Sequence, residues 1–251
     1  MEIKDILGIK PIGEAGLEAT KAAIKGVSSF LEVVFKPGLE ELGFLMKDEV
    51  RSWRLLNILR TLEKAKGKMD FDGQELNLTA NARVGLAIMS ESSEVDNVEL
   101  QDLWAGLFVS SCSPDGRDDS NMIFVDLLRR MSTVEAKIIN YACNNCKKTL
   151  HPNKLITANH INVSIEDLIK IAETDDIYRL DREMDHMRSI ELLISGDFGG
   201  GGFEASDSLD ADITPSPLAL NLYYRTHSTG ISPIDFWGDS LIPSKEEEKN
   251  K

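Results

Sequence analysis

The chain has 251 residues, 42% of them hydrophobic, so it is long enough to bury a core in one large or two small domains. Its formal net charge of −14 argues against general binding to nucleic acid or anionic lipid, because such a surface repels phosphate groups. Three cysteines are too few for a disulfide framework, and the first residues do not read as a secretory signal, so we expect a protein of the reducing cytoplasm. No charge-free apolar stretch approaches the roughly 20 residues that a membrane-spanning helix needs.

The first predicted element is a helix over Glu14–Phe35, within an N-terminal segment of residues 1–36. Its apolar side chains recur at alternating spacings of three and four residues, which is the pattern of a helix packed on another helix. Three settings stay open for it: docking on its own domain, self-association into a homo-oligomer, and peripheral contact with a membrane surface. Four of its residues are the predicted partner-binding residues: Leu17, Ile24, Val27 and Leu31.

A helical domain is predicted over residues 37–131. It should hold a long amphipathic helix over Leu39–Lys66, a short one over Thr79–Met89, and two more over Asp96–Cys112 and Asn121–Met131. The last two carry apolar stripes at helical spacing, and the polar link between them lets them fold back as a hairpin. The stripes consist of Leu100, Leu103, Trp104, Leu107 and Phe108, and of Phe124, Leu127, Leu128 and Met131.

Two helix starts carry the signature of a capping box. Asp96 is followed three residues later by Glu99, and Ser132 is followed by Glu135 in the same way. In this motif a side-chain oxygen and a returning carboxylate satisfy backbone N–H groups that the helix leaves unpaired. We therefore expect helices to begin at both positions.

The unit over residues 132–228 is predicted to be winged-helix-like. Its first helix follows the capping box, a second is capped by Ser164, and a third covers Asp176–Leu193. Four glycines at 199–202 and a partly alternating segment over Ala211–Ser228 then suggest a small β-hairpin with a flexible tip. Three helices followed by a hairpin is the winged-helix order.

The predicted fold class is mainly α: a helical bundle and hairpin domain, then a winged-helix-like α+β unit with a small hairpin, then a charged tail over residues 229–251. A winged helix raises the question of DNA binding, which needs a basic third helix. Here acidic residues outnumber basic ones, so we expect no DNA binding. The acidic set is Asp175, Asp176, Asp181, Glu183 and Asp185, against Arg179, Arg182 and Arg188.

One cluster has the spacing of a metal site. Cys143, Cys146, His151 and His160 form C-x2-C-x4-H-x8-H, which could hold zinc, and the C-x-x-C could also support redox chemistry. Both cysteines fall one turn after apolar residues of a predicted helix, and free cysteine packs as a small hydrophobe. We therefore predict core packing for both thiols, with no metal site, no cofactor and no catalytic residues in the chain.

Three segments carry packing motifs that occur together: Leu39–Leu62 with Trp53-Arg54, Glu94–Leu107 around Leu100-Gln-Asp-Leu-Trp-Ala, and Leu127–Ile139 around Leu128-Arg-Arg-Met-Ser-Thr-Val-Glu-Ala-Lys-Ile. With Ile213-Thr-Pro-Ser-Pro-Leu-Ala-Leu, they resemble the bacterial Abi-alpha (abortive infection alpha) family over roughly residues 39–226. Ala219 stands where the family usually has glycine. The resemblance implies a role in bacterial defence against phage, and it carries no catalytic residues across.

We therefore expect a non-enzymatic, cytoplasmic anti-phage protein that acts through protein–protein contacts or at the inner membrane surface. The helix over Glu14–Phe35 is its predicted association element, and the sequence does not identify the phage or host protein that triggers the response. The alternative is a winged-helix DNA-binding transcriptional regulator, and an enzyme ranks third.

Overall fold

The structure is a computed structural model. It describes residues 14–35, 51–70, 77–196, 210–228 and 232–244, with the side chains of 14–23 and 51–52 also left aside. Helices dominate these residues, and the strands are two or three residues long, which confirms the predicted mainly α class with small β elements. None of the described helices is both long enough and apolar enough to cross a bilayer.

The chain divides into two compact units. One consists of Met1–Arg129 with Arg225–Thr229, and the other of Arg130–Tyr224 with Gly230–Lys251. The last turn of one helix therefore belongs to the first unit, although the rest of that helix belongs to the second. The finer predicted division, with separate segments over 1–36 and 229–251, stays a prediction.

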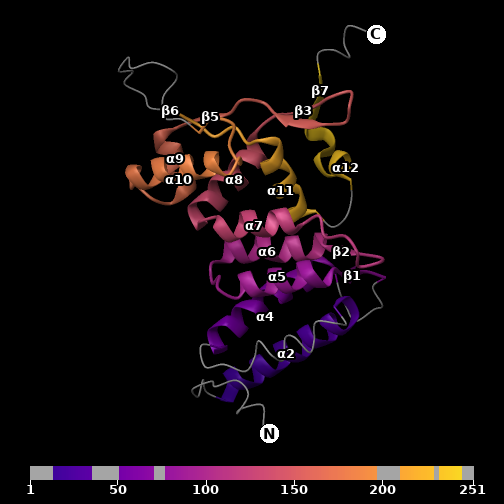
Figure 1. Cartoon of the computed structure of the whole chain (residues 1–251). Helices are drawn as coiled ribbons and strands as arrows, with labels where there is room; N and C mark the ends of the chain where they lie inside the picture. The colour runs from indigo at the N-terminus through magenta and orange to yellow at the C-terminus, as the bar shows by residue number, and fades with distance from the viewer. Residues whose placement is uncertain (1–13, 36–50, 71–76, 197–209, 229–231, 245–251) are drawn as a thin grey trace. The chain divides into compact units, whose positions relative to one another are not determined.

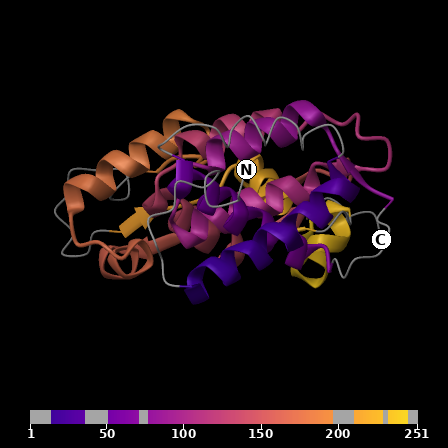
Figure 2. The same ribbon diagram turned by 90° about the horizontal axis from the view of Figure 1, so that it is seen from below.

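The described residues of the first unit form helices and one two-stranded sheet. Helix α4 packs on α5 and α6, and α2 lies against α4, as Figures 1 and 2 show. Strands β1 and β2 pair antiparallel, with Thr79 opposite Ser113. Its elements are α2 (Glu14–Val34), α4 (Arg51–Lys68), β1 (Thr79–Ala80), α5 (Ala82–Ser92), α6 (Val98–Ser110), β2 (Cys112–Ser113) and α7 (Met122–Arg130).

Helix α6 forms the centre of this unit. The predicted stripe is buried in full, from Leu100 to Phe108, and so are Gln101, Ala105, Gly106 and Val109 between its members. The helix is thus covered on nearly all sides, although the stripe predicted one buried face. The remaining predicted stripe on α7, with Met131, is buried as well.

The predicted capping box at Asp96 is wrong by one residue. Asn97 caps α6, because its side-chain oxygen accepts a hydrogen bond from the N–H of Leu100 at 3.1 Å. Asparagine is as good a cap as aspartate, and its position places the bond on the third helical residue. The predicted short helix is confirmed as α5, which starts after Asn81. The start predicted at Leu39 lies outside the described residues.

In the part of the second unit that the structure describes, helices are combined with two small sheets. Strand β3 lies between β4, which is antiparallel to it, and β7, which is parallel; β5 pairs antiparallel with β6. Its elements are α8 (Thr133–Asn145), β3 (Lys148–Leu150), β4 (Ile156–Ala158), β5 (Asn162–Ser164), α9 (Ile165–Ala172), α10 (Ile177–Ser189), β6 (Asp210–Asp212), α11 (Pro217–His227), α12 (Pro233–Trp237), the 3-10 turn η2 (Gly238–Ser240) and β7 (Leu241–Pro243).

The three predicted helices of this unit are confirmed as α8, α9 and α10, but the hairpin after them is not found as predicted. After α10 the described chain returns on itself through one isolated bridge, between Leu193 and Pro215. Strand β6 pairs with β5 instead, and residues 217–227, predicted to continue the hairpin, form helix α11. Pro217 is compatible with a helix start, because its missing N–H would be unpaired there in any case. The winged-helix description stays a prediction.

Gly106 is the described glycine that leaves the least room for a side chain. A Cβ atom at this position would lie 1.6 Å from the backbone oxygen of Thr226, at the end of α11. We expect Gly106→Ala to lower the free energy of unfolding by about 1–3 kcal/mol, because the backbone of α11 must move. Gly67→Ala on α4 is the matched control, since a Cβ there meets nothing within 4 Å. It should be neutral or stabilise by up to about 1 kcal/mol in urea unfolding, through helix propensity. Equal effects of the two substitutions would contradict the close approach.

Candidate functional site

The most extensive polar cluster in the second unit joins the start of α8 to α10. Its centre is Glu135, whose side chain is fully buried. One carboxylate oxygen accepts the backbone N–H of Ser132 at 2.7 Å, which completes the predicted capping box. The other oxygen lies 2.5 Å from Nδ1 of His186 on α10. A carboxylate removed from water thus has a partner on each oxygen, as burial of a charge requires.

Ser132 extends the cluster toward a second carboxylate. Its hydroxyl accepts the N–H of Glu135 at 3.2 Å and donates to Oε2 of Glu183 at 2.7 Å. Nε of Arg179 donates to the other oxygen of Glu183 at 3.2 Å. Arg179, Glu183 and His186 are spaced by four and three residues, so they share one face of α10. We refer to these five residues as the α8–α10 cluster.

Burial raises the pKa of Glu135, although the hydrogen bonds from Ser132 and His186 act in the opposite direction. A buried carboxylate that orients an imidazole through Nδ1 is also found in hydrolases and behind metal ligands. Here the hydroxyl of Ser132 donates to Glu183 and no bond joins it to His186, so a Ser–His–Glu relay is not formed. The cluster ties two helices together.

The double role of Ser132 can be measured. Ser132→Ala should cost more free energy of unfolding than Ser164→Ala. Both hydroxyls cap a helix, but the carboxylate that Ser132 also bonds, on Glu183, is largely buried, whereas that of Asp167 beside Ser164 is exposed. A cap is worth about 1 kcal/mol, and a hydrogen bond to a charged group about 1.5–3 kcal/mol. In a Glu183→Gln background the excess cost of Ser132→Ala should shrink. An excess that is absent in the wild-type background would contradict the bond.

A second cluster gathers around Asp212 of β6. The hydroxyls of Ser195 and Thr214 both donate to its carboxylate, the second at 2.5 Å, and the N–H of Thr214 donates at 2.8 Å. Nδ1 of His160 lies 3.0 Å from the hydroxyl of Thr214 and 3.5 Å from Asp212. A catalytic triad places histidine between serine and carboxylate, whereas Ser195 bonds Asp212 directly. This cluster anchors the chain that follows α10.

Asp212 predicts a dependence of stability on pH. Burial raises its pKa, but the hydrogen bonds from Ser195 and Thr214 outweigh burial, and the pKa lies below its usual range. The stability that Asp212 contributes is therefore present above its unfolded pKa, about 3.9, and is lost as the pH falls through its folded pKa. We expect Asp212→Asn to destabilise the protein near neutral pH and to lose this effect in acid. Asp210→Asn, on the same strand at an exposed position, controls for the loss of one negative charge.

The spacing of Cys143, Cys146, His151 and His160 left zinc binding as an alternative to core packing, and the structure shows where these four side chains lie. Cys143 and Cys146 are buried, and burial raises the pKa of both thiols. His151 and His160 instead bond Thr157 and Thr214. Among the described residues, no group of three or more candidate ligands is placed to hold a metal ion. The absence of zinc stays a prediction for metal analysis.

Lys148 is a residue that sequence reasoning missed. Its ammonium is buried, donates to the carbonyl of Cys146 at 2.9 Å, and lies 4.3 Å from the ring centroid of Trp237. The same tryptophan stacks on Tyr223, with ring centroids 5.4 Å apart. A cation over an indole is a favourable way to bury a charge. The contact depends on the pairing of β3 with β7, which brings Lys148 close to a tryptophan far away in the chain, and the sequence gives no sign of this pairing.

The predicted partner-binding residues of α2 are distributed differently from the expectation. Val27 and Leu31 are buried within the first unit, Ile24 is half-buried, and the side chain of Leu17 lies outside the described residues. Phe30, from the same helix, lies with its ring centroid 6.2 Å from that of Phe108 on α6. The described half of α2 therefore docks on its own unit, which was one of the three settings left open.

Comparison with known proteins identifies the family. The family model described as abortive infection alpha matches residues 56–210, which is more than half of the chain. The match includes α5 to α10 and all five residues of the α8–α10 cluster. No curated protein and no solved structure gives a significant match. The chain therefore belongs to the abortive infection alpha family, as its packing motifs indicated.

Proposed function

We propose that this protein acts in abortive infection from the cytoplasm, through contacts with other proteins or with the inner membrane surface, and without catalysis. Membership of the family supports the defence role. The two polar clusters support action without catalysis, because their side chains are engaged in hydrogen bonds that hold elements of the fold together. Abortive infection then depends on what the surface binds.

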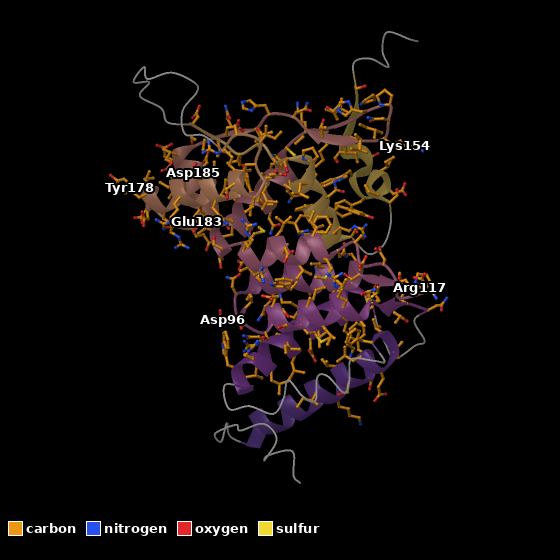
Figure 3. All side chains as sticks on the ribbon, viewed as in Figure 1. Asp96, Arg117, Lys154, Tyr178, Glu183 and Asp185 are labelled. Carbon is orange, nitrogen blue, oxygen red and sulfur yellow. The ribbon has the colours of Figure 1, made fainter. Side chains whose placement is uncertain are left out.

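The observation that carries this proposal is the set of large apolar side chains exposed on the second unit. Tyr178 is the extreme case, with 87% of its surface accessible at the start of α10, and Figure 3 shows it projecting from that helix. Tyrosine is enriched at protein interfaces because it offers a rigid apolar ring with a polar end. The others are Tyr141, Leu155, Ile177, Ile194 and Ile242.

Self-association through the N-terminal helix stays part of the proposal, in a narrower form. Val27 and Leu31 already pack within their own unit, so of the predicted residues with described side chains only the half-buried Ile24 could meet a second copy. Removal of residues 1–36 would also strip Phe30 and Phe35 from the core. A truncation of this kind therefore does not test association cleanly.

DNA binding ranks second. A recognition helix needs cations that reach the bases, but Arg179 bonds Glu183, and Arg188 bonds Asp185 at 2.6 Å. These pairs engage two of the three arginines of α10, and three acidic side chains lie on the same helix, so α10 is poorly suited to contact DNA phosphates. We therefore keep the regulator as the alternative.

Phage plating tests the proposal. Bacteria that express the full chain should show reduced plating of at least some members of a broad phage panel. Tyr178→Ala should weaken this protection without changing the melting temperature, because the ring is exposed, whereas Tyr178→Phe should retain it. Unchanged plating with the wild-type chain would refute the defence role, and full protection by Tyr178→Ala would exclude this residue from the contact.

A further inference from the structure

Helix α4 has a charge that contrasts with the rest of the chain. Its 18 residues include six lysines and arginines and one glutamate, a net of +5. Because the whole chain carries −14, the remaining residues carry −19. Such asymmetry within one chain is typical of an element that meets an anionic surface.

Some of these cations are engaged within the unit. Arg54 lies 3.3 Å from Glu94, and Lys64 and Lys68 lie 3.5 and 3.0 Å from Asp102. The two carboxylates reduce the local net charge from +5 to +3. The helix therefore stays cationic after its described ion pairs are counted.

One face of α4 combines this charge with exposed apolar surface. Trp53, Leu56, Arg60 and Lys64 are spaced by three, four and four residues, so they lie along one side of the helix. Trp53 is 43% exposed, Arg60 is exposed, and Leu56 and Lys64 are half-buried. We call these four residues the α4 outer face. Tryptophan beside arginine and lysine is the combination favoured at the boundary between headgroups and acyl chains.

We infer that the α4 outer face docks on an anionic lipid surface, an inference that rests on the proposed action at the membrane. The α4 outer face takes the place of α2 as the expected membrane contact, because Val27 and Leu31 of α2 pack within the unit and cannot meet lipid in this structure. Phosphate recognition alone, as on nucleic acid, would require cations but neither Trp53 nor Leu56. Binding should be weak, because the rest of the chain is negatively charged. It should weaken further as salt rises, because salt screens the attraction between the cations of α4 and the lipid headgroups.

Intrinsic fluorescence can follow this docking in the full-length protein. The chain has three tryptophans, and Trp104 and Trp237 are buried, so Trp53 is the one that solvent reaches most. Vesicles of phosphatidylglycerol at low ionic strength should shift the emission to shorter wavelength and sediment with the protein. Vesicles of phosphatidylcholine should do neither. Trp53→Phe should remove the shift while most of the sedimentation remains.

A matched pair of charge variants separates this face from general attraction. Arg60→Gln should lower the partition onto phosphatidylglycerol about fivefold, equivalent to about 1 kcal/mol for one cation near the surface. Arg83→Gln, at an exposed position on α5, removes the same charge away from the face and should change it much less. Equal losses, equal binding to phosphatidylcholine, or no sedimentation with phosphatidylglycerol would each overturn the inference.

Two further measurements, of DNA binding and of phage plating, separate this inference from nucleic-acid binding and from the defence role. Binding to random duplex DNA at the same salt that is stronger than binding to vesicles, and lost in Arg60→Gln, would assign the face to nucleic acid and overturn the lipid inference. Phage plating is scored separately on the same variants. Protection by the wild-type chain without vesicle binding would refute this inference and leave the defence role standing, whereas vesicle binding without protection would refute the defence role alone.

Discussion

The burial of α6 is the constraint on which the first unit depends. A helix covered on nearly every side must present apolar or small residues around its whole circumference, and α6 does so from Leu103 to Val109. Where the cover is the backbone of another helix, only glycine fits, and Gly106 faces Thr226 in this way. The end of α11 is thereby fixed in this unit, although most of α11 folds with the other.

The second unit is held by a different means. Its helices have apolar cores, but the start of α8 is joined to α10 through a buried carboxylate shared between a backbone N–H and His186. Burying Glu135 carries a desolvation cost, which its two partners offset. Replacement of His186 would leave one oxygen of Glu135 without its partner inside the protein. Polar residues of the types found in catalytic sites can thus connect two helices by hydrogen bonds instead.

These properties shape how the protein can act in defence. The polar clusters are occupied by internal bonds, whereas Tyr178 and Trp53 expose aromatic rings on the two units. An exposed ring near charged groups suits recognition of another surface better than chemistry on a small substrate. Trp53 lies on a basic helix, whereas α10, which carries Tyr178, has three acidic side chains and three arginines, so the two proposed contacts call for different partners.

The amino-acid sequence alone determined helix α2 and the helices from α5 to α10, the cap at Ser132, the buried stripes and the family, because these follow from periodicity and local hydrogen bonding within a few residues. Only the tertiary structure decided the rest. The pairing of Glu135 with His186, the cation of Lys148 over Trp237 and the docking of α2 join residues far apart in the chain, and spacing carries no information about such contacts. The helix α11 in place of a hairpin strand has the same cause, since a partly alternating segment takes the conformation that its neighbours can cover.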